Sequence, residues 1–180
     1  RQHCSYIVLV SATDGNHGRS LAWGAQKCGA RCQIYIHSEV SEGRAQAIRE
    51  FGAEVVRIRG EYDDSVASAK QDALQNGSFL VLDTSYPGYT ERPRDVMAGY
   101  GVMADEIVQA LPEAPTHVFL QAGVGGLAAS VAARLRQLWG NKSPRVVVVE
   151  PDLAPCFFES QKAGAATTVK IEQETIMAGL

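Results

Sequence analysis

Short apolar runs alternate with amphipathic segments along most of this chain, and the two patterns predict different elements. In residues 41–51, for example, Ala45, Ile48 and Phe51 recur at helical spacing and share one face. We expect helices over residues 19–28, 41–51, 63–74, 95–111, 125–139 and 157–162. We expect strands over residues 7–10, 32–36, 54–58, 79–82, 117–121 and 145–150.

The strands are apolar enough to be buried on both sides. Residues 146–149, for instance, are all valine, as in parallel sheets that have no solvated face. Because such strands alternate here with helices, we expect an α/β protein with parallel sheets covered by helices on both faces. The pattern changes near residue 78, ahead of a loop rich in Tyr, Pro and Gly, so we expect two domains over residues 1–78 and 79–180.

Composition is that of an ordinary globular protein. The hydrophobic share is 46% and the charged share 21%, which excludes disordered and fibrous classes. The net charge of −3 gives no electrostatic case for nucleic acid or an anionic membrane. No apolar stretch approaches the roughly 18 residues that span a bilayer, and the first residues lack the apolar core of a secretion signal.

Cysteine and histidine give no metal pattern. Cys28 and Cys32 form a C-x-x-x-C pair without a second Cys/His pair, and His3, His37 and His117 have no partners at metal spacing. Sparse, unpatterned cysteines that pack as small apolar residues are typical of a reducing cytoplasm, where we expect the protein to be located.

A first candidate site follows the first expected strand. Residues 11–19 read Ser-Ala-Thr-Asp-Gly-Asn-His-Gly-Arg and lead into a helical pattern. Such a strand–turn–helix connection presents N–H groups and side chains at the carboxyl edge of a sheet, where α/β proteins bind ligands. A structural loop explains one or two of the polar residues Asp14, Asn16 and His17, but not all three.

A second glycine-rich turn, at residues 121–127, joins another strand to another helix. Its glycines allow a close backbone approach, and the helix N-terminus favours an anion such as phosphate. Gly123, Gly125 and Ala128 also fit the G-x-G-x-x-A dinucleotide fingerprint, with Glu150 near the position of the ribose-binding acid. A nicotinamide-binding protein, and glycines that serve only tight packing, are therefore alternatives.

The third segment, residues 81–90, places Asp83 directly after a buried strand. A carboxylate there caps a turn as readily as it meets a ligand. Tyr86 and Tyr89 follow it, either as pocket lining or as loop packing.

Several segments together resemble the fold-type II pyridoxal phosphate enzymes, which include threonine and serine dehydratases and cysteine synthases. Residues 11–18 are similar to their S-x-G-N-H-G segment, residues 96–107 to their A-G-x-G-T-x-x-x-E-I segment, and residues 121–127 to their phosphate loop. The dinucleotide interpretation explains neither the first nor the second of these segments. The resemblance implies a two-lobed architecture, with residues 1–78 in the small lobe and 79–180 in the large lobe.

Within that family, the chain resembles the ammonia-lyases that act on 2,3-diaminopropionate. The matching segments are residues 13–19, 61–66, 83–90, 115–118, 121–125 and 176–180. The resemblance implies a lyase of amino-acid catabolism, a homodimer, that uses pyridoxal phosphate for an α,β-elimination yielding pyruvate and ammonia. The cofactor's ring takes up electron density, so that the α-proton becomes removable.

The resemblance also implies roles for individual residues. Asp14 and Asp83 match the acid/base and substrate-ammonium groups, with Asp14 implicated for the D-isomer, and Asn16 matches the residue that binds the cofactor's phenolic oxygen. The phosphate cradle corresponds to Gly123, Val124, Gly125 and Gly126. Thr13, His17, Tyr86 and Tyr89 are pocket candidates, although His17 in this motif is better explained as a scaffold group. We expect Asp14, Asn16, Asp83 and the glycine turn to converge on one cleft.

One feature departs from the family. Its cofactor-binding lysine lies in a Phe-Lys segment upstream of S-x-G-N-H-G, whereas residues 1–10 contain no lysine, and the lysines at positions 27, 70, 142, 162 and 170 lie in other contexts. We therefore expect a central part of a longer enzyme, inactive by itself. The alternatives are a threonine/serine dehydratase-like lyase and a non-catalytic, truncated or diverged phosphate-binding protein.

Overall fold

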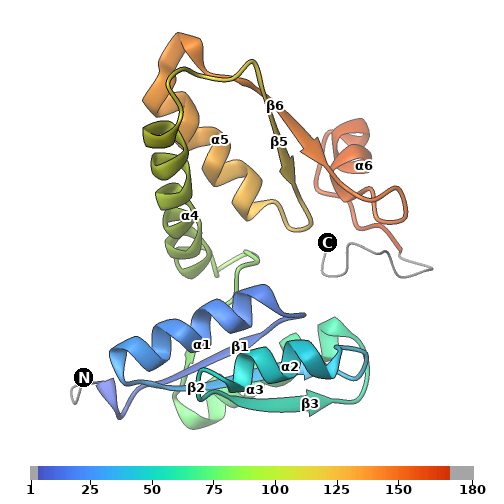
Figure 1. Cartoon of the computed structure of the whole chain (residues 1–180). Coiled ribbons are helices and arrows are strands. Elements are labelled where there is room, and N and C mark those ends of the chain that lie inside the picture. The colour runs from blue at the N-terminus through green and yellow to red at the C-terminus, as the bar shows by residue number, and fades with distance from the viewer. Residues whose placement is uncertain (1–3, 171–180) are drawn as a thin grey trace. The chain divides into compact units, whose positions relative to one another are not determined.

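The computed structural model describes residues 4–170, and the chain divides into two compact units, Arg1–Leu82 and Asp83–Leu180 (Figure 1). The boundary expected at residue 78 precedes this division because strand β4 (Phe79–Leu80) pairs with strand β1 (Val8–Ala12) and so belongs to the first unit. The segment at residues 176–180 lies outside the described residues.

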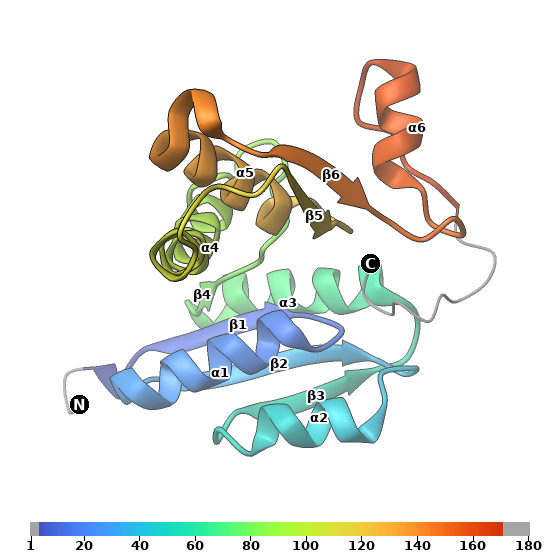
Figure 2. The ribbon, with the colours of Figure 1, turned by 45° about the horizontal axis from the view of Figure 1, so that its top comes forward.

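The first unit contains a four-stranded parallel sheet in the order β3-β2-β1-β4. β2 spans Arg31–His37 and β3 spans Glu54–Ile58. Helices α1 (Asn16–Cys28) and α2 (Glu42–Arg49) cover one face, and α3 (Tyr62–Asn76) covers the other (Figure 2). Helices on both faces are therefore confirmed for this unit.

The core of the first unit follows the alternation of β2. Ile34 and Ile36 are fully buried in the cluster that includes Ala22 of α1 and Ile48 of α2. Tyr35, between them in sequence, faces the opposite way, toward Asp72 of α3. Burial, and then the nearby carboxylates of Asp72 and Glu54, raise the pKa of Tyr35.

The second unit is built on a parallel pair, β5 (His117–Gln121) and β6 (Arg145–Val149). The helices of this unit are α4 (Glu91–Ala110), α5 (Gly126–Trp139), the 3-10 turn η2 (Gly140–Lys142) and α6 (Cys156–Ala163). Leu120 of β5 packs with the buried Val131 and Leu135 of α5. The Arg134 Nε atom of α5 lies 2.8 Å from Asp105 Oδ1 of α4.

The sheet of the second unit differs from the expectation of cover on both faces. Phe119 alternates with Leu120 along β5 and is 68% exposed, whereas Leu120 is 7% exposed. Within the described residues, helices thus cover only the Leu120 face. Across the same residues, no helix has the length and apolar character needed to cross a membrane.

Candidate functional site

The turn between β1 and α1 is built around the buried side chain of Thr13. Its hydroxyl oxygen accepts hydrogen bonds from the Gly15 N–H, at 3.0 Å, and from the Gly18 N–H, at 3.4 Å. The Thr13 N–H donates to the carbonyl of Tyr35 on β2. Thr13, predicted as pocket lining, therefore holds the shape of the turn.

Gly18 is required by this arrangement. A Cβ atom at Gly18 would lie 2.3 Å from Thr13 Cγ2 and 3.1 Å from Ile34 Cγ2, closer than side-chain carbons approach. Because Gly18 has no side chain, the first turn of α1 packs closely against Thr13 and the sheet.

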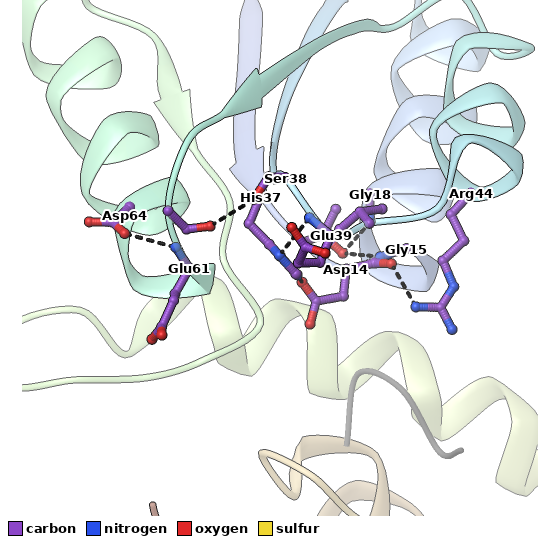
Figure 3. A network of polar contacts seen from close by, with 12 residues as sticks. Asp14, Gly15, Gly18, His37, Ser38, Glu39, Arg44, Glu61 and Asp64 are labelled. Atoms are coloured by element: carbon purple, nitrogen blue, oxygen red, sulfur yellow. Dashed lines mark hydrogen bonds and ion pairs between the residues drawn. The ribbon is translucent and has the colours of Figure 1, made fainter. Parts of the chain in front are cut away.

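Asp14 stands at the tip of the turn, beside the end of β2 (Figure 3). Its Oδ1 atom lies 3.1 Å from Nε2 of His37, and the two side chains are 28% and 17% exposed. Its main-chain carbonyl accepts a hydrogen bond from Arg44 Nη1 of α2 at 3.4 Å. His37 was not among the residues expected at the site. It lies at the carboxyl end of the expected strand that follows the motif, a position where α/β proteins often bind ligands.

The two other polar residues of the motif begin helix α1. His17 Nε2 lies 2.8 Å from the main-chain carbonyl of Val81, so this ring nitrogen carries the proton and donates to the segment after β4. Asn16 is exposed and lines an open hollow of about 280 Å³ with Arg19, Ser20, Trp23 and Phe51.

The second glycine turn connects β5 to α5. The Ala122 N–H donates to the carbonyl of Val149, which fixes the start of the turn. Gly125, the N-cap of α5, has φ +84°, and a Cβ atom there would lie 2.2 Å from the Phe157 ring. Glycine is therefore needed for both backbone conformation and space.

Asp83 lies next to this turn within the second unit. The Asp83 carbonyl oxygen would be 4.0 Å from a Cβ atom on Gly126, and the Thr84 hydroxyl donates to Asp83 Oδ1 at 3.4 Å. Burial, and then the Asp83 carboxylate, raise the pKa of Tyr100 on α4. The structure thus places the main chain of Asp83 beside the glycine turn, with its carboxylate near enough to the Tyr100 phenol to affect its pKa.

Tyr86 and Tyr89 pack on each other. They form an antiparallel bridge, and their rings stack with centroids 4.9 Å apart and planes at 11°. This contact gives the loop after Asp83 a defined shape.

Glu150, the expected ribose-binding acid of the dinucleotide interpretation, caps helix α6. Its two carboxylate oxygens accept hydrogen bonds from the N–H groups of Phe157 and Phe158, at 2.9 and 2.8 Å. Both oxygens are thereby engaged with main chain, which leaves the dinucleotide fingerprint without its acid.

Comparison with known proteins decides between the families. The family described as pyridoxal-phosphate dependent enzyme matches residues 1–180. The chain belongs to this family. It has the fold of the family's fold-type II structures, and pyridoxal phosphate is the family's cofactor.

Individual relatives indicate which members of this family the chain is similar to. The chain is 40% identical to a diaminopropionate ammonia-lyase of Escherichia coli K12 over 97% of its own length and 44% of that protein. A solved Escherichia coli diaminopropionate ammonia lyase, in complex with an aminoacrylate-PLP azomethine reaction intermediate, is 39% identical with a TM-score of 0.88, over 96% of this chain and 44% of that one. A probable D-serine dehydratase of Acidovorax ebreus is 30% identical over 88% of this chain and 35% of that protein. The chain thus spans less than half the length of these relatives.

The glycine turn of this family member fits the phosphate of pyridoxal phosphate. Within residues 4–170, no side chain caps the N-terminus of α5, and the first N–H groups of a helix have no partner inside it. The helix dipole favours an anion at this end, and the glycines at positions 123, 125 and 126 place no side chain in front of these N–H groups.

Two lysines on helices make surface contacts. Lys162 Nζ lies 2.9 Å from Glu159 Oε1, and Lys27 Nζ lies 5.6 Å from the centre of the Trp23 ring. Both sit on helices, α6 and α1, in surroundings unlike a cofactor-binding lysine.

Proposed function

We propose that the full-length protein, of which this chain is one part, catalyses the pyridoxal phosphate-dependent α,β-elimination of 2,3-diaminopropionate, releasing pyruvate and ammonia. The observation that carries the proposal is Asp83, whose main chain lies beside Gly126 at an uncapped, glycine-lined helix N-terminus. A diamino acid carries a second ammonium group, which an added carboxylate can hold. The likeness to diaminopropionate ammonia-lyases supports the same substrate.

The residue roles are part of the proposal. Gly123, Val124, Gly125 and Gly126 bind the cofactor's phosphate through main-chain N–H groups, and Asn16 binds its phenolic oxygen. When bound, the cofactor's ring withdraws electron density from Cα and makes its proton acidic. Asp14 removes that proton from the D-isomer, and Asp83 serves as the second acid/base or ammonium-binding group.

We further propose that residues 1–82 form part of a small lobe and residues 83–180 part of a large lobe of a longer enzyme. We also propose that the protein is a homodimer and that it is located in the cytoplasm. The free thiols of Cys4, Cys28, Cys32 and Cys156 support a reducing compartment, and sedimentation velocity and cell fractionation test the two statements.

Pyruvate release from D- and L-2,3-diaminopropionate, with pyridoxal phosphate present, tests the function. Replacing Asp14 by Asn should lower kcat for the D-isomer on the order of 100-fold, the usual contribution of a general base, and change the melting temperature little. Asp95→Asn, on the exposed side of α4, is the matched control. Equal losses for both isomers in a folded Asp14→Asn protein would contradict the assignment of Asp14.

A dehydratase is the second candidate, favoured by the likeness to a probable D-serine dehydratase. Serine and threonine supply a hydroxyl leaving group instead of an amine, and they yield pyruvate and 2-oxobutanoate respectively. A higher kcat/KM for D-serine or L-threonine than for either diaminopropionate isomer would establish this alternative. Absence of turnover by the full-length protein with all of these substrates would support a non-catalytic phosphate-binding protein.

A further inference from the structure

We propose that His37 is a positioning residue for Asp14, holding its carboxylate through the Nε2 proton. The inference deepens the proposed function, on which its catalytic consequence rests. Its structural part concerns only the first unit.

Strand pairing brings the two residues together. β1 and β2 are parallel neighbours in which Ala12 pairs with Tyr35, so Asp14 and His37 lie two positions beyond the same rung of the ladder. His37 Nε2 and Asp14 Oδ1 are therefore 3.1 Å apart, within ion-pair contact.

A main-chain contact selects the ring's protonation. The Glu39 N–H lies 3.3 Å from His37 Nδ1 and donates to it. Because Nδ1 accepts a hydrogen bond, it carries no proton, and a neutral imidazole must then hold its proton on Nε2. The nitrogen that carries this proton lies 3.1 Å from Asp14 Oδ1, and a charged acceptor strengthens such a contact.

The loop that carries His37 is itself held in place. The Arg57 guanidinium, from β3, donates to the main-chain carbonyls of Val40, Ser38 and His37 at 2.7, 2.9 and 3.3 Å. Its other terminal nitrogen lies 3.1 Å from Glu42 Oε2 of α2. The Arg57 side chain thereby holds three carbonyl groups of the loop, which restricts the movement of the His37 imidazole.

Both the main chain and the side chain of Asp14 are thus contacted by residues of other elements. Arg44 holds its carbonyl and His37 faces its carboxylate. A general base held in one orientation reaches one face of a substrate better than a mobile one. Loss of His37 should therefore affect kcat for the isomer that Asp14 deprotonates more than KM.

The kinetic test compares His37→Leu with His37→Gln in the protein loaded with pyridoxal phosphate. Leu has no donor, whereas the Gln amide nitrogen can take the place of Nε2. We expect His37→Leu to lower kcat for D-2,3-diaminopropionate about tenfold, with KM and the L-isomer rate nearly unchanged, and His37→Gln to restore most of the loss. His117→Leu, on β5, is the control and should behave as wild type. Equal losses for both isomers, or no restoration by Gln in a folded protein, would overturn the proposal.

A second measurement needs no activity. Nitrogen-15 NMR of the histidine rings at pH 8 should show His37 as the Nε2–H tautomer, and Asp14→Ala should shift its Nε2 signal while leaving His117 unchanged. An Nδ1–H tautomer, or a His37 ring insensitive to Asp14→Ala, would refute the positioning role. If the wild-type protein does not convert diaminopropionate, the proposed function fails. The NMR measurement still tests whether His37 contacts Asp14.

Discussion

At the scale of single residues, two glycines in helix α1 have opposite environments. A Cβ atom at Gly18 would collide with Thr13 and crowd Ile34, whereas one at Gly24 would meet nothing within 4 Å. Gly18→Ala should therefore destabilise the first unit by about 1–3 kcal/mol through overpacking. Gly24→Ala should stabilise it by about 0.5–1 kcal/mol, because glycine is a poor residue inside a helix.

Urea unfolding followed by circular dichroism measures both changes. The two variants add the same methyl group to the same helix, so their difference isolates the contact with Thr13. A Gly18→Ala protein as stable as Gly24→Ala would show that the turn can move away from α1, and that Thr13 does not fix it.

Individual residues also mark where prediction from the sequence ends. Asp14, Asn16 and His17 could be identified as a site because they follow one strand in one segment. His37 could not be paired with Asp14 in this way, because that contact depends on β2 lying next to β1. The sequence offers several orders for parallel strands, and only the observed order places the imidazole beside the carboxylate.

At the scale of elements, helix α5 has a glycine with positive φ at each end. Gly125 and Gly140 have φ +84° and +54°, so alanine is strained at both. Only at Gly125 would the added methyl also strike a ring, that of Phe157. Gly125→Ala should weaken pyridoxal phosphate binding at least tenfold, whereas Gly140→Ala should bind as wild type. Equilibrium dialysis measures both constants, and equal affinities would remove the glycine turn from the cofactor site.

Helix α6 depends on an acid outside it. Replacing Glu150 by Ala removes the acceptors for the Phe157 and Phe158 N–H groups. Loss of such a cap costs about 1 kcal/mol, so hydrogen exchange at these two amides should be roughly fivefold faster. Glu159→Ala, which removes only a surface pair with Lys162, should leave their exchange close to wild type. Unchanged exchange in Glu150→Ala would mean that water replaces the carboxylate without loss.

Element boundaries show which local signals were decisive. The predicted strand 117–121 is confirmed residue for residue. Helix α4 begins at Glu91 instead of Asp95, because Pro93 lies in the first turn, where its missing N–H costs nothing. Helix α3 has Glu61 as its N-cap, and Asp64, in its first turn, accepts a hydrogen bond from the Glu61 N–H. The sequence could place these helices, but not decide which of several acidic residues caps them.

At the scale of the whole molecule, the two units have unequal cores. The first has a sheet covered on both faces, whereas the second, in its described residues, has Phe119 exposed on one face. We expect the second unit to unfold at a lower urea concentration than the first. Trp139, which packs on the second core, reports one transition by fluorescence.

Cys32 reports the other transition. Burial raises the pKa of its thiol to about 12, so at pH 8 the folded protein presents almost no thiolate there and iodoacetamide should react with the exposed Cys28 instead. Labelling of Cys32 should begin only as the first unit unfolds, at higher urea than the change in Trp139 emission. Coincident transitions would show that the units unfold together.

The contact between the Ser11 hydroxyl and the Val81 carbonyl joins residues that are 70 positions apart. On the ribosome, β1 must therefore wait for its second neighbour while the intervening chain is made. At roughly 5–20 residues per second, this delay is about 4–14 s, far longer than a helix needs to form. During that interval the nascent chain carries β1 with one edge unpaired, the state in which chaperones recognise strands and wrong pairings arise.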